Sequence, residues 1–423
     1  GEATQMNVFD IAAVLIGLSA LFGYINHQYL KLPHTIGLVV IALAASLSII
    51  VVELLWPAST VSETVTAVLN DIDFHEALMH GMLSFLLFAG ALHVDFSAFR
   101  QQALPIGMMA TLGILISTFL IGWVSWFLLN LFDIEIPFAW ALVFGALISP
   151  TDPVAVLSIF RTVQVPEALE ASMAGESLFN DGVGVVVFTV VVALAGSTGG
   201  PVTAATIAEL FVYEAIGGAM LGLAAGYIGY RAMHHIDEHN LEVLITLAMV
   251  MVTYVMAIRL HMSGPIAMVV AGLFIGNKGM RFAVSEQSRD DIRKFWSLLD
   301  EILNSVLFLL IGLEVLVIAQ RADHIGAAIL LIPVTIAARW AAVFVPIAIL
   351  TRWRAFEKGS IPILTWGGLR GGIAVALALS LPANEYKATI LTITYAVVLF
   401  SIIVQGLTIK PLVERTISRG GVG

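Results

Sequence analysis

The most informative segment of the sequence reads Gly175-Glu176-Ser177-Leu178-Phe179-Asn180-Asp181-Gly182. It places two carboxylates, an amide and a hydroxyl inside a run from residue 169 to 194 that is otherwise rich in Val, Ala, Phe and Met. An ionised group at the centre of a bilayer costs about 2.5–3.5 kcal/mol on insertion scales, so two in one helix require partners or a use. On a helix Ser177 and Asp181 share one face, and Glu176 and Asn180 form the adjacent stripe. The segment therefore predicts a membrane helix whose polar side faces a partner or a water-filled cavity.

The composition supports a membrane protein. Of 423 residues, 59% are hydrophobic and 12% are charged, whereas soluble domains carry about 25% charged residues. The absence of cysteine excludes disulfides and thiolate metal sites. The net charge of −10, without a basic stripe, gives no reason to expect nucleic acid as a partner. No positively charged segment precedes the first apolar run, so we expect no cleavable signal peptide.

Hydropathy predicts an all-α polytopic protein with about thirteen transmembrane helices. The apolar segments are 7–26, 34–56, 74–94, 104–131, 138–160, 169–195, 202–233, 241–259, 264–277, 297–319, 324–350, 360–381 and 386–412. Residues 281–296 carry charges on one face, which predicts an amphipathic helix lying on the membrane surface.

The basic residues predict the orientation. If the amino terminus lies outside, fifteen of the twenty Lys and Arg residues fall in cytoplasmic segments. The opposite side then holds Arg259, Arg321 and Lys387, and Arg339 and Arg370 lie within predicted spans. This bias follows the positive-inside rule, so we expect an odd number of spans and a cytoplasmic carboxyl terminus.

Two spans are interrupted at mid-length. In segment five the break is Ser149-Pro150-Thr151-Asp152-Pro153, where Pro150 and Pro153 remove two backbone donors. In segment twelve it is Gly367-Gly368-Leu369-Arg370-Gly371-Gly372, where four glycines surround one arginine. Unwound backbone at membrane depth must be buried or line a cavity. Paired broken helices at matching places, here in segments four to six and eleven to thirteen, predict a transporter with inverted repeats.

These breaks place Asp152, Thr151 and Arg370 near the helix that carries Asp181. Carboxylate, hydroxyl and carbonyl oxygens suit a small hard cation. A half-desolvated Asp181 that binds either a proton or a cation would support alternating access. Asp152 also fits a second reading, as the N-cap of a half-helix. Glu176 needs a cation, and Arg339, in the middle of segment eleven, is the expected structural partner. Arg370 fits either a structural role or control of the local field at Asp181.

Taken together, Gly-Glu-Ser-Leu-Phe-Asn-Asp, Ser-Pro-Thr-Asp-Pro and Gly-Gly-Leu-Arg-Gly-Gly resemble the sodium/proton antiporters of the cation–proton antiporter superfamily. The Asn-Asp pair looks like the NhaP-type and animal exchanger branch. The resemblance implies an NhaA-like antiporter fold with two crossing broken helices, a homodimer in the inner or plasma membrane, and no cofactor. It implies electroneutral exchange of one Na⁺, or of Li⁺ or K⁺, for one H⁺, serving pH and sodium homeostasis.

By the same resemblance, Asp181 carries the ion and the proton, and Ser177 and Thr151 help to coordinate. Asn180 and Asp152 order the crossing of the broken helices, which includes Pro150, Pro153 and Arg370, and Glu176 and Arg339 form a structural ion pair. The implied dimerisation domain comprises residues 1–103 and 196–319, and the implied transport core comprises residues 104–195 and 320–417.

One position departs from the family pattern. Where many NhaP-type relatives have Leu-Phe-Glu-Gly-Ala-Leu, this chain has Ala89 in place of the acidic residue. The carboxylate that those relatives carry at this position is therefore absent here, and ion selectivity is the property that this change affects.

Two other functions remain open at this stage. An intramembrane aspartyl protease would use Asp152 and Asp181 as its two carboxylates, although its usual Gly-x-Gly-Asp signature is absent. The other alternative is a cation channel.

Overall fold

The computed structural model describes residues 8–56, 65–66, 69, 74–94, 96–160, 162–163, 165–196, 204–236, 238–280, 285–316 and 325–420. Within these ranges every regular element is a helix. The α-helices are α1 (Val8–Ile25), α2 (His34–Leu55), α4 (Phe74–Glu76), α5 (Leu83–His93), α6 (Phe96–Met108), α7 (Ile114–Leu131), α8 (Phe138–Ile148), α9 (Val154–Phe160), α10 (Glu167–Gly196), α11 (Ala204–Met233), α12 (His239–Arg259), α13 (Gly264–Phe274), α15 (Glu286–Leu313), α17 (Ile325–Leu350), α18 (Ser360–Gly367), α19 (Gly372–Leu379), α20 (Lys387–Phe400) and α21 (Gly406–Gly420). Short π-helical turns occupy Asn26–Leu30, Ala77–Met82, Met109–Gly113, Ile275–Gly279 and Ser401–Gln405.

The predicted all-helical membrane architecture is confirmed. In the described ranges, 10 helices are long and apolar enough to cross a membrane, and the pair α18 and α19 raises the number to 11. The helices Phe138–Ile148 and Gly264–Asn277 are apolar but shorter. Each of the thirteen apolar segments contains helix, but length and composition support ten or eleven spans. The count of thirteen therefore stays a prediction.

Both predicted interruptions are present. The chain leaves helical geometry between α8 and α9, where the two prolines stand, and again between α18 and α19, where glycines surround Arg370. The axes of α18 and α19 differ by 44°. Proline removes a donor and clashes with the preceding turn, and glycine lowers the cost of leaving the helix. These residues therefore end the half-helices inside otherwise apolar spans.

The expected amphipathic helix at 281–296 needs correction. Residues 286–296 are the first turns of α15, which continues without a break to Leu313, and residues 281–284 lie outside the described ranges. Ile292 and Trp296 are fully buried, and the Trp296 indole donates a hydrogen bond to Thr246 Oγ1 at 3.0 Å. The apolar face of this charged stretch packs on α12 rather than on a lipid surface.

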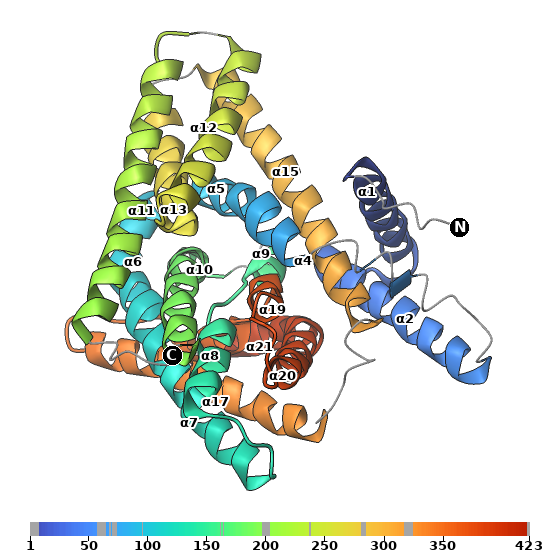
Figure 1. The fold of residues 1–423 in the computed structure, drawn as a ribbon. Helices are drawn as coiled ribbons and strands as arrows, with labels where there is room; N and C mark the ends of the chain where they lie inside the picture. The colour runs from blue at the N-terminus through green and yellow to red at the C-terminus, as the bar shows by residue number, and fades with distance from the viewer. Residues whose placement is uncertain are drawn as a thin grey trace.

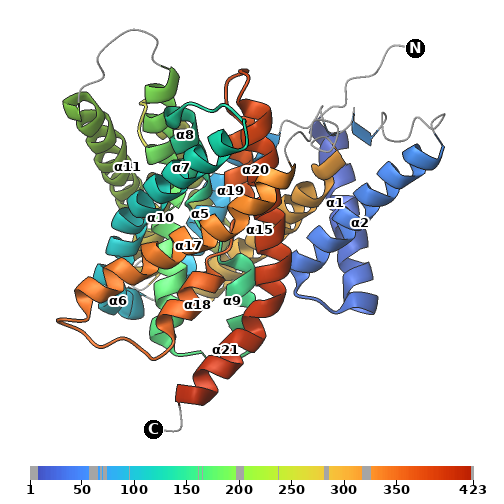
Figure 2. The ribbon, with the colours of Figure 1, turned by 90° about the horizontal axis from the view of Figure 1, so that it is seen from below.

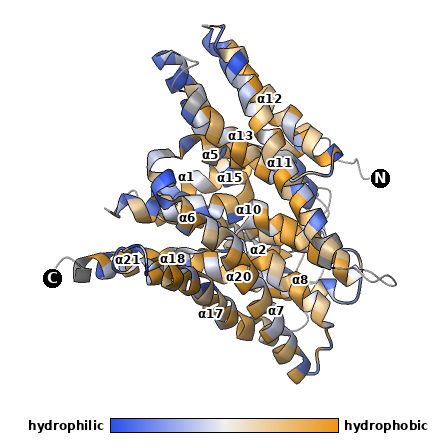
Figure 3. Cartoon of the chain, turned by 90° about the vertical axis from the view of Figure 1, so that its left-hand side faces the viewer, coloured by the Kyte–Doolittle hydropathy of each residue, from blue (hydrophilic) through white to orange (hydrophobic). Residues whose placement is uncertain are grey.

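The two broken helices meet α10, α15 and α5 in the interior of the fold. The broken helices lie beside α10, and Figure 2 shows α9 and α18 between α10 and α21, with α19 next to α20. In Figure 1 the long helix α15 runs from α12 toward α1 and α2, and it also packs against α5. Figure 3 shows apolar residues along the lengths of the helices and hydrophilic residues mainly toward their ends. This packing brings α10, α15, α5 and the two breaks together.

Candidate functional site at the helix crossing

The two interrupted segments contact each other through their backbones. The Asp152 N–H donates to the Leu369 carbonyl oxygen at 2.8 Å. A Cβ added to Gly371 would collide with the Asp152 side chain. Only a residue without a side chain permits this approach, so the glycines of the second break serve close contact as well as unwinding.

Arg370 joins the second break to the end of α8. Its Nη1 donates to the carbonyl oxygens of Ser149 and Pro150, the latter at 3.1 Å. Its own N–H donates to Ser401 Oγ at 2.9 Å. Carbonyls at a helix carboxyl end carry partial negative charge and lack intrahelical partners. The buried guanidinium therefore satisfies them, which gives Arg370 a structural role at the crossing.

The polar stripe of α10 docks onto the first break. Ser177 Oγ donates to the Thr151 carbonyl oxygen, and Asn180 Nδ2 donates to Thr151 Oγ1 at 2.8 Å. Ser177, Asn180 and Thr151 are buried. The Asp152 carboxylate accepts from the Val154 N–H at 3.0 Å, and so caps the first N–H of α9, which has no intrahelical partner.

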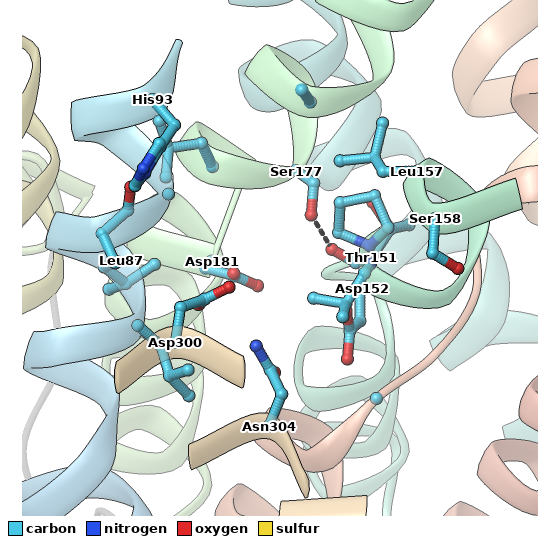
Figure 4. Close-up of a pocket in the computed structure, with 18 of the residues that line it drawn as sticks. Leu87, His93, Thr151, Asp152, Leu157, Ser158, Ser177, Asp181, Asp300 and Asn304 are labelled. Atoms are coloured by element: carbon cyan, nitrogen blue, oxygen red, sulfur yellow. Dashed lines mark hydrogen bonds between the residues drawn. The ribbon is translucent and has the colours of Figure 1, made fainter. Parts of the chain in front are cut away.

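Asp181 faces a cavity of about 660 Å³, together with Thr151, Asp152 and Ser177. Since a water takes roughly 30 Å³ of liquid, the space holds a hydrated cation with room to spare. Figure 4 shows the Asp181 carboxylate on one side of this space and Thr151 and Asp152 on the other. The Asp181 carboxylate is therefore accessible from this cavity.

Glu176 and Arg339 form a buried ion pair between α10 and α17. Arg339 Nη2 donates to Glu176 Oε2 at 2.9 Å, and Nη1 contacts the other carboxylate oxygen. Arg339 also donates from Nε and Nη2 to the Leu364 carbonyl of α18, at 3.2 and 2.9 Å. The pair thus joins three helices, and neither side chain lines the cavity at Asp181.

Sequence reasoning missed the contribution of α15. Ser297, Asp300, Glu301, Asn304 and Leu307 all line the cavity. Their spacing of three and four residues places them on one helix face, and that periodicity within an apolar span was a usable signal. The position that departs from the family pattern, Ala89, lies on the α5 side of the same cavity and is buried.

Comparison with known proteins identifies the family. Residues 17–415 match the family model described as sodium/hydrogen exchanger, transmembrane. The chain is 46% identical over 413 residues to the Na⁺/H⁺ antiporter NhaP of Pseudomonas aeruginosa, covering 96% of this chain and 97% of that protein. It is 34% identical over 392 residues to the antiporter NhaH of Halobacillus dabanensis, covering 92% and 93%. The chain belongs to the sodium/hydrogen exchanger family.

The fold agrees with this assignment. A solved structure of the sodium proton antiporter MjNhaP1 of Methanocaldococcus jannaschii superposes with a TM-score of 0.76 at 20% sequence identity, covering 97% of this chain and 100% of that one. The family consists of transporters and not enzymes, and the comparisons give no support to the aspartyl protease or the channel. An exchanger of this family needs no cofactor, because the ions are its substrates.

Proposed function

We propose that this exchanger moves Na⁺ and H⁺ in opposite directions across a membrane by alternating access, with Asp181 as the shared carrier. The observation that carries the proposal is Asp181 lining a cavity of about 660 Å³ beside two crossed helix breaks. The names of the similar antiporters support the same pair of ions.

Electrostatics explains why one carboxylate couples the two ions. Moving an unpaired charge out of water costs roughly several kcal/mol of solvation free energy, even after the protein relaxes. Asp181 can therefore pass through a closed state only when a proton or a cation neutralises it. Both loaded states carry the same net charge, so one carboxylate supports electroneutral one-for-one exchange.

The polar neighbours of Asp181 fit coordination of a hard cation. Thr151 and Ser177 bring hydroxyl and carbonyl oxygens to the same cavity, although Ser177 and Asn180 also hold Thr151 in place. We assign Asp152 to both capping and ion approach. Pro150, Pro153 and Arg370 shape the crossing, and Glu176 and Arg339 stabilise the core.

The predicted orientation decides to which side of the membrane the cavity opens. Its lining includes His93, Ser158 and Glu167, which lie at the ends of segments assigned to the cytoplasmic side. We therefore assign the arrangement to an inward-open state, with the amino terminus outside. Residues 104–195 and 320–417 form the moving core in this proposal. Residues 1–103 and 196–319 form the scaffold of a homodimer.

The decisive experiment measures proton flux in proteoliposomes after addition of Na⁺. Asp181→Asn is expected to abolish exchange, because the amide binds neither ion as a carboxylate does. Asp290→Asn is the matched control, because Asp290 is an exposed carboxylate on α15 that does not line the cavity. Clamping the membrane potential at different values should leave the rate unchanged. Exchange by Asp181→Asn at the control rate would refute the mechanism, and a voltage-dependent rate would refute one-for-one coupling.

A further inference from the structure

We propose that Asn304 of α15 is a cation ligand on the wall facing Asp181 and determines affinity only in the inward-open state. This inference rests on the proposed exchange function and adds a specificity-determining residue to the same site. Figure 4 shows Asn304 extending from α15 toward the space between Asp181 and Asp152.

The first support is that Asn304 is buried without a partner. Its side chain is 4% exposed, and no hydrogen bond joins it to any residue in the described ranges. Burying an amide without a hydrogen bond costs about 1–3 kcal/mol by protein mutational data. Because Asn304 lines the cavity, its amide is placed to pair with water or with an ion there.

The second support is the state of the other oxygens. On the wall of the cavity that the proposed core forms, the Ser177 hydroxyl donates a hydrogen bond to the Thr151 carbonyl oxygen. The Thr151 hydroxyl oxygen accepts one from the Asn180 amide. The oxygens of Thr151 each accept one hydrogen bond and keep one lone pair, so the core wall alone offers a cation few ligands beside Asp181. An amide carbonyl oxygen is a hard ligand, and hard cations prefer oxygen ligands of this kind.

The third support is the distribution of polar groups around the cavity. The α5 wall contributes Leu83, Leu86, Leu87, Ala89 and Gly90, and His93 only near its end. Beside it, α15, which packs against α5, presents Asp300 and Asn304 on one face, one turn apart. A cation leaving water meets oxygen ligands on α15 and methyl groups on α5.

The location of Asn304 gives the proposal a directional consequence. Asp181 lies on α10, within the proposed moving core, whereas Asn304 lies on α15 of the proposed scaffold. When the core moves, the cation stays with Asp181 and loses Asn304. Asn304 therefore contributes to affinity on the side onto which this cavity opens and not on the other side.

The test compares the KM for Na⁺, Li⁺ and K⁺ in everted and right-side-out vesicles. Asn304→Ala is expected to raise the Na⁺ KM about tenfold on one side only, the size expected for loss of one bond to a charged group, with kcat within about twofold. The K⁺ KM should change less, because a larger ion is held less strongly by one carbonyl. Gln287→Ala is the matched amide control, since Gln287 is exposed on α15 outside the cavity.

Asn304→Asp keeps an oxygen at the same place and is expected to restore the KM to the natural value or below it. An unchanged KM in Asn304→Ala, an equal rise on both sides, or a fall in kcat alone would overturn the proposal. If Asp181→Asn also retained exchange, the proposed function would fail with it. If Asp181→Asn is inactive and Asn304→Ala is normal, only this inference fails.

Discussion

At the scale of single residues, the two carboxylates of the crossing have different surroundings. Asp152 accepts a backbone hydrogen bond from Val154 and donates its own N–H across the crossing. For Asp181, a turn after Ser177 on α10, the structure gives no hydrogen bond in the described ranges, and its carboxylate faces the cavity. A carboxylate fixed by backbone groups is suited to holding geometry, and a carboxylate facing water is suited to exchanging its occupant.

This difference predicts a separation of stability from transport at Asp152. Asp152→Asn keeps an N-cap acceptor, whereas Asp152→Ala removes it at a cost of about 1 kcal/mol. We expect both variants to lose most Na⁺-driven proton flux, because each removes a charge beside the cavity. Only Asp152→Ala should lower the melting temperature of the purified protein. Natural flux in Asp152→Asn would leave Asp152 with the capping role alone.

The buried ion pair has another kind of role. Removing one partner of such a pair leaves an uncompensated buried charge, at a typical cost of about 3–5 kcal/mol. Arg339, held by Glu176, also donates to the Leu364 carbonyl oxygen of α18. The pair thus fixes one half of the second broken helix to α10, which keeps the crossing beside Asp181.

At the scale of elements, the crossing depends on the second break passing close to the first. Gly371 has φ −124° and ψ −160°, a conformation that any residue adopts, so its importance comes from space. Gly371→Ala forces the new methyl group against the Asp152 side chain. Overpacking of this kind costs about 1–3 kcal/mol, and here it displaces the cap of α9.

We therefore expect Gly371→Ala to lower the melting temperature and to abolish most proton flux in proteoliposomes. Gly107→Ala in α6 is the matched control, because a Cβ at Gly107 meets nothing within 4 Å and alanine favours the helix. Full activity in Gly371→Ala would show that the close approach of the breaks is dispensable for transport.

Much of this arrangement could be predicted from local sequence. Two prolines only three residues apart, Pro150 and Pro153, predict a break, as do the four glycines around Arg370, whereas α6, α17 and α21 continue through well-separated prolines. The polar stripe of α10 follows from spacing alone. The continuity of α15 and the position of Asn304 could not be obtained in this way. They depend on which distant helices pack together, and one amide in an apolar span gives no indication of its neighbours.

The partners of Arg370 show the same limit. Its charge within a broken span indicated a polar neighbour, but the carbonyls of Ser149 and Pro150 became its partners only through the crossing. A buried side chain with several donors finds its acceptors in three dimensions, and backbone carbonyls leave no signal in the sequence.

At the scale of the whole molecule, the cavity opens on one side of the proposed membrane. Ser158, at the α9 side of the cavity, is exposed and lines it. Glu135 is exposed in the connection between α7 and α8. This connection precedes segment five, and Ser158 lies at the other end of that segment. The chain has no cysteine, so a single introduced thiol reports its own surroundings without background.

We expect Ser158→Cys to react with a membrane-impermeant maleimide in everted vesicles and not in right-side-out vesicles. Glu135→Cys should show the opposite pattern, because the positive-inside bias places the two positions on different sides. Reaction of both cysteines from the same side would contradict the proposed orientation, and no reaction of Ser158→Cys from either side would contradict an open cavity. Conditions that turn the core outward should slow Ser158→Cys labelling and leave Glu135→Cys unchanged, because only the first position lies in the space that alternating access must close.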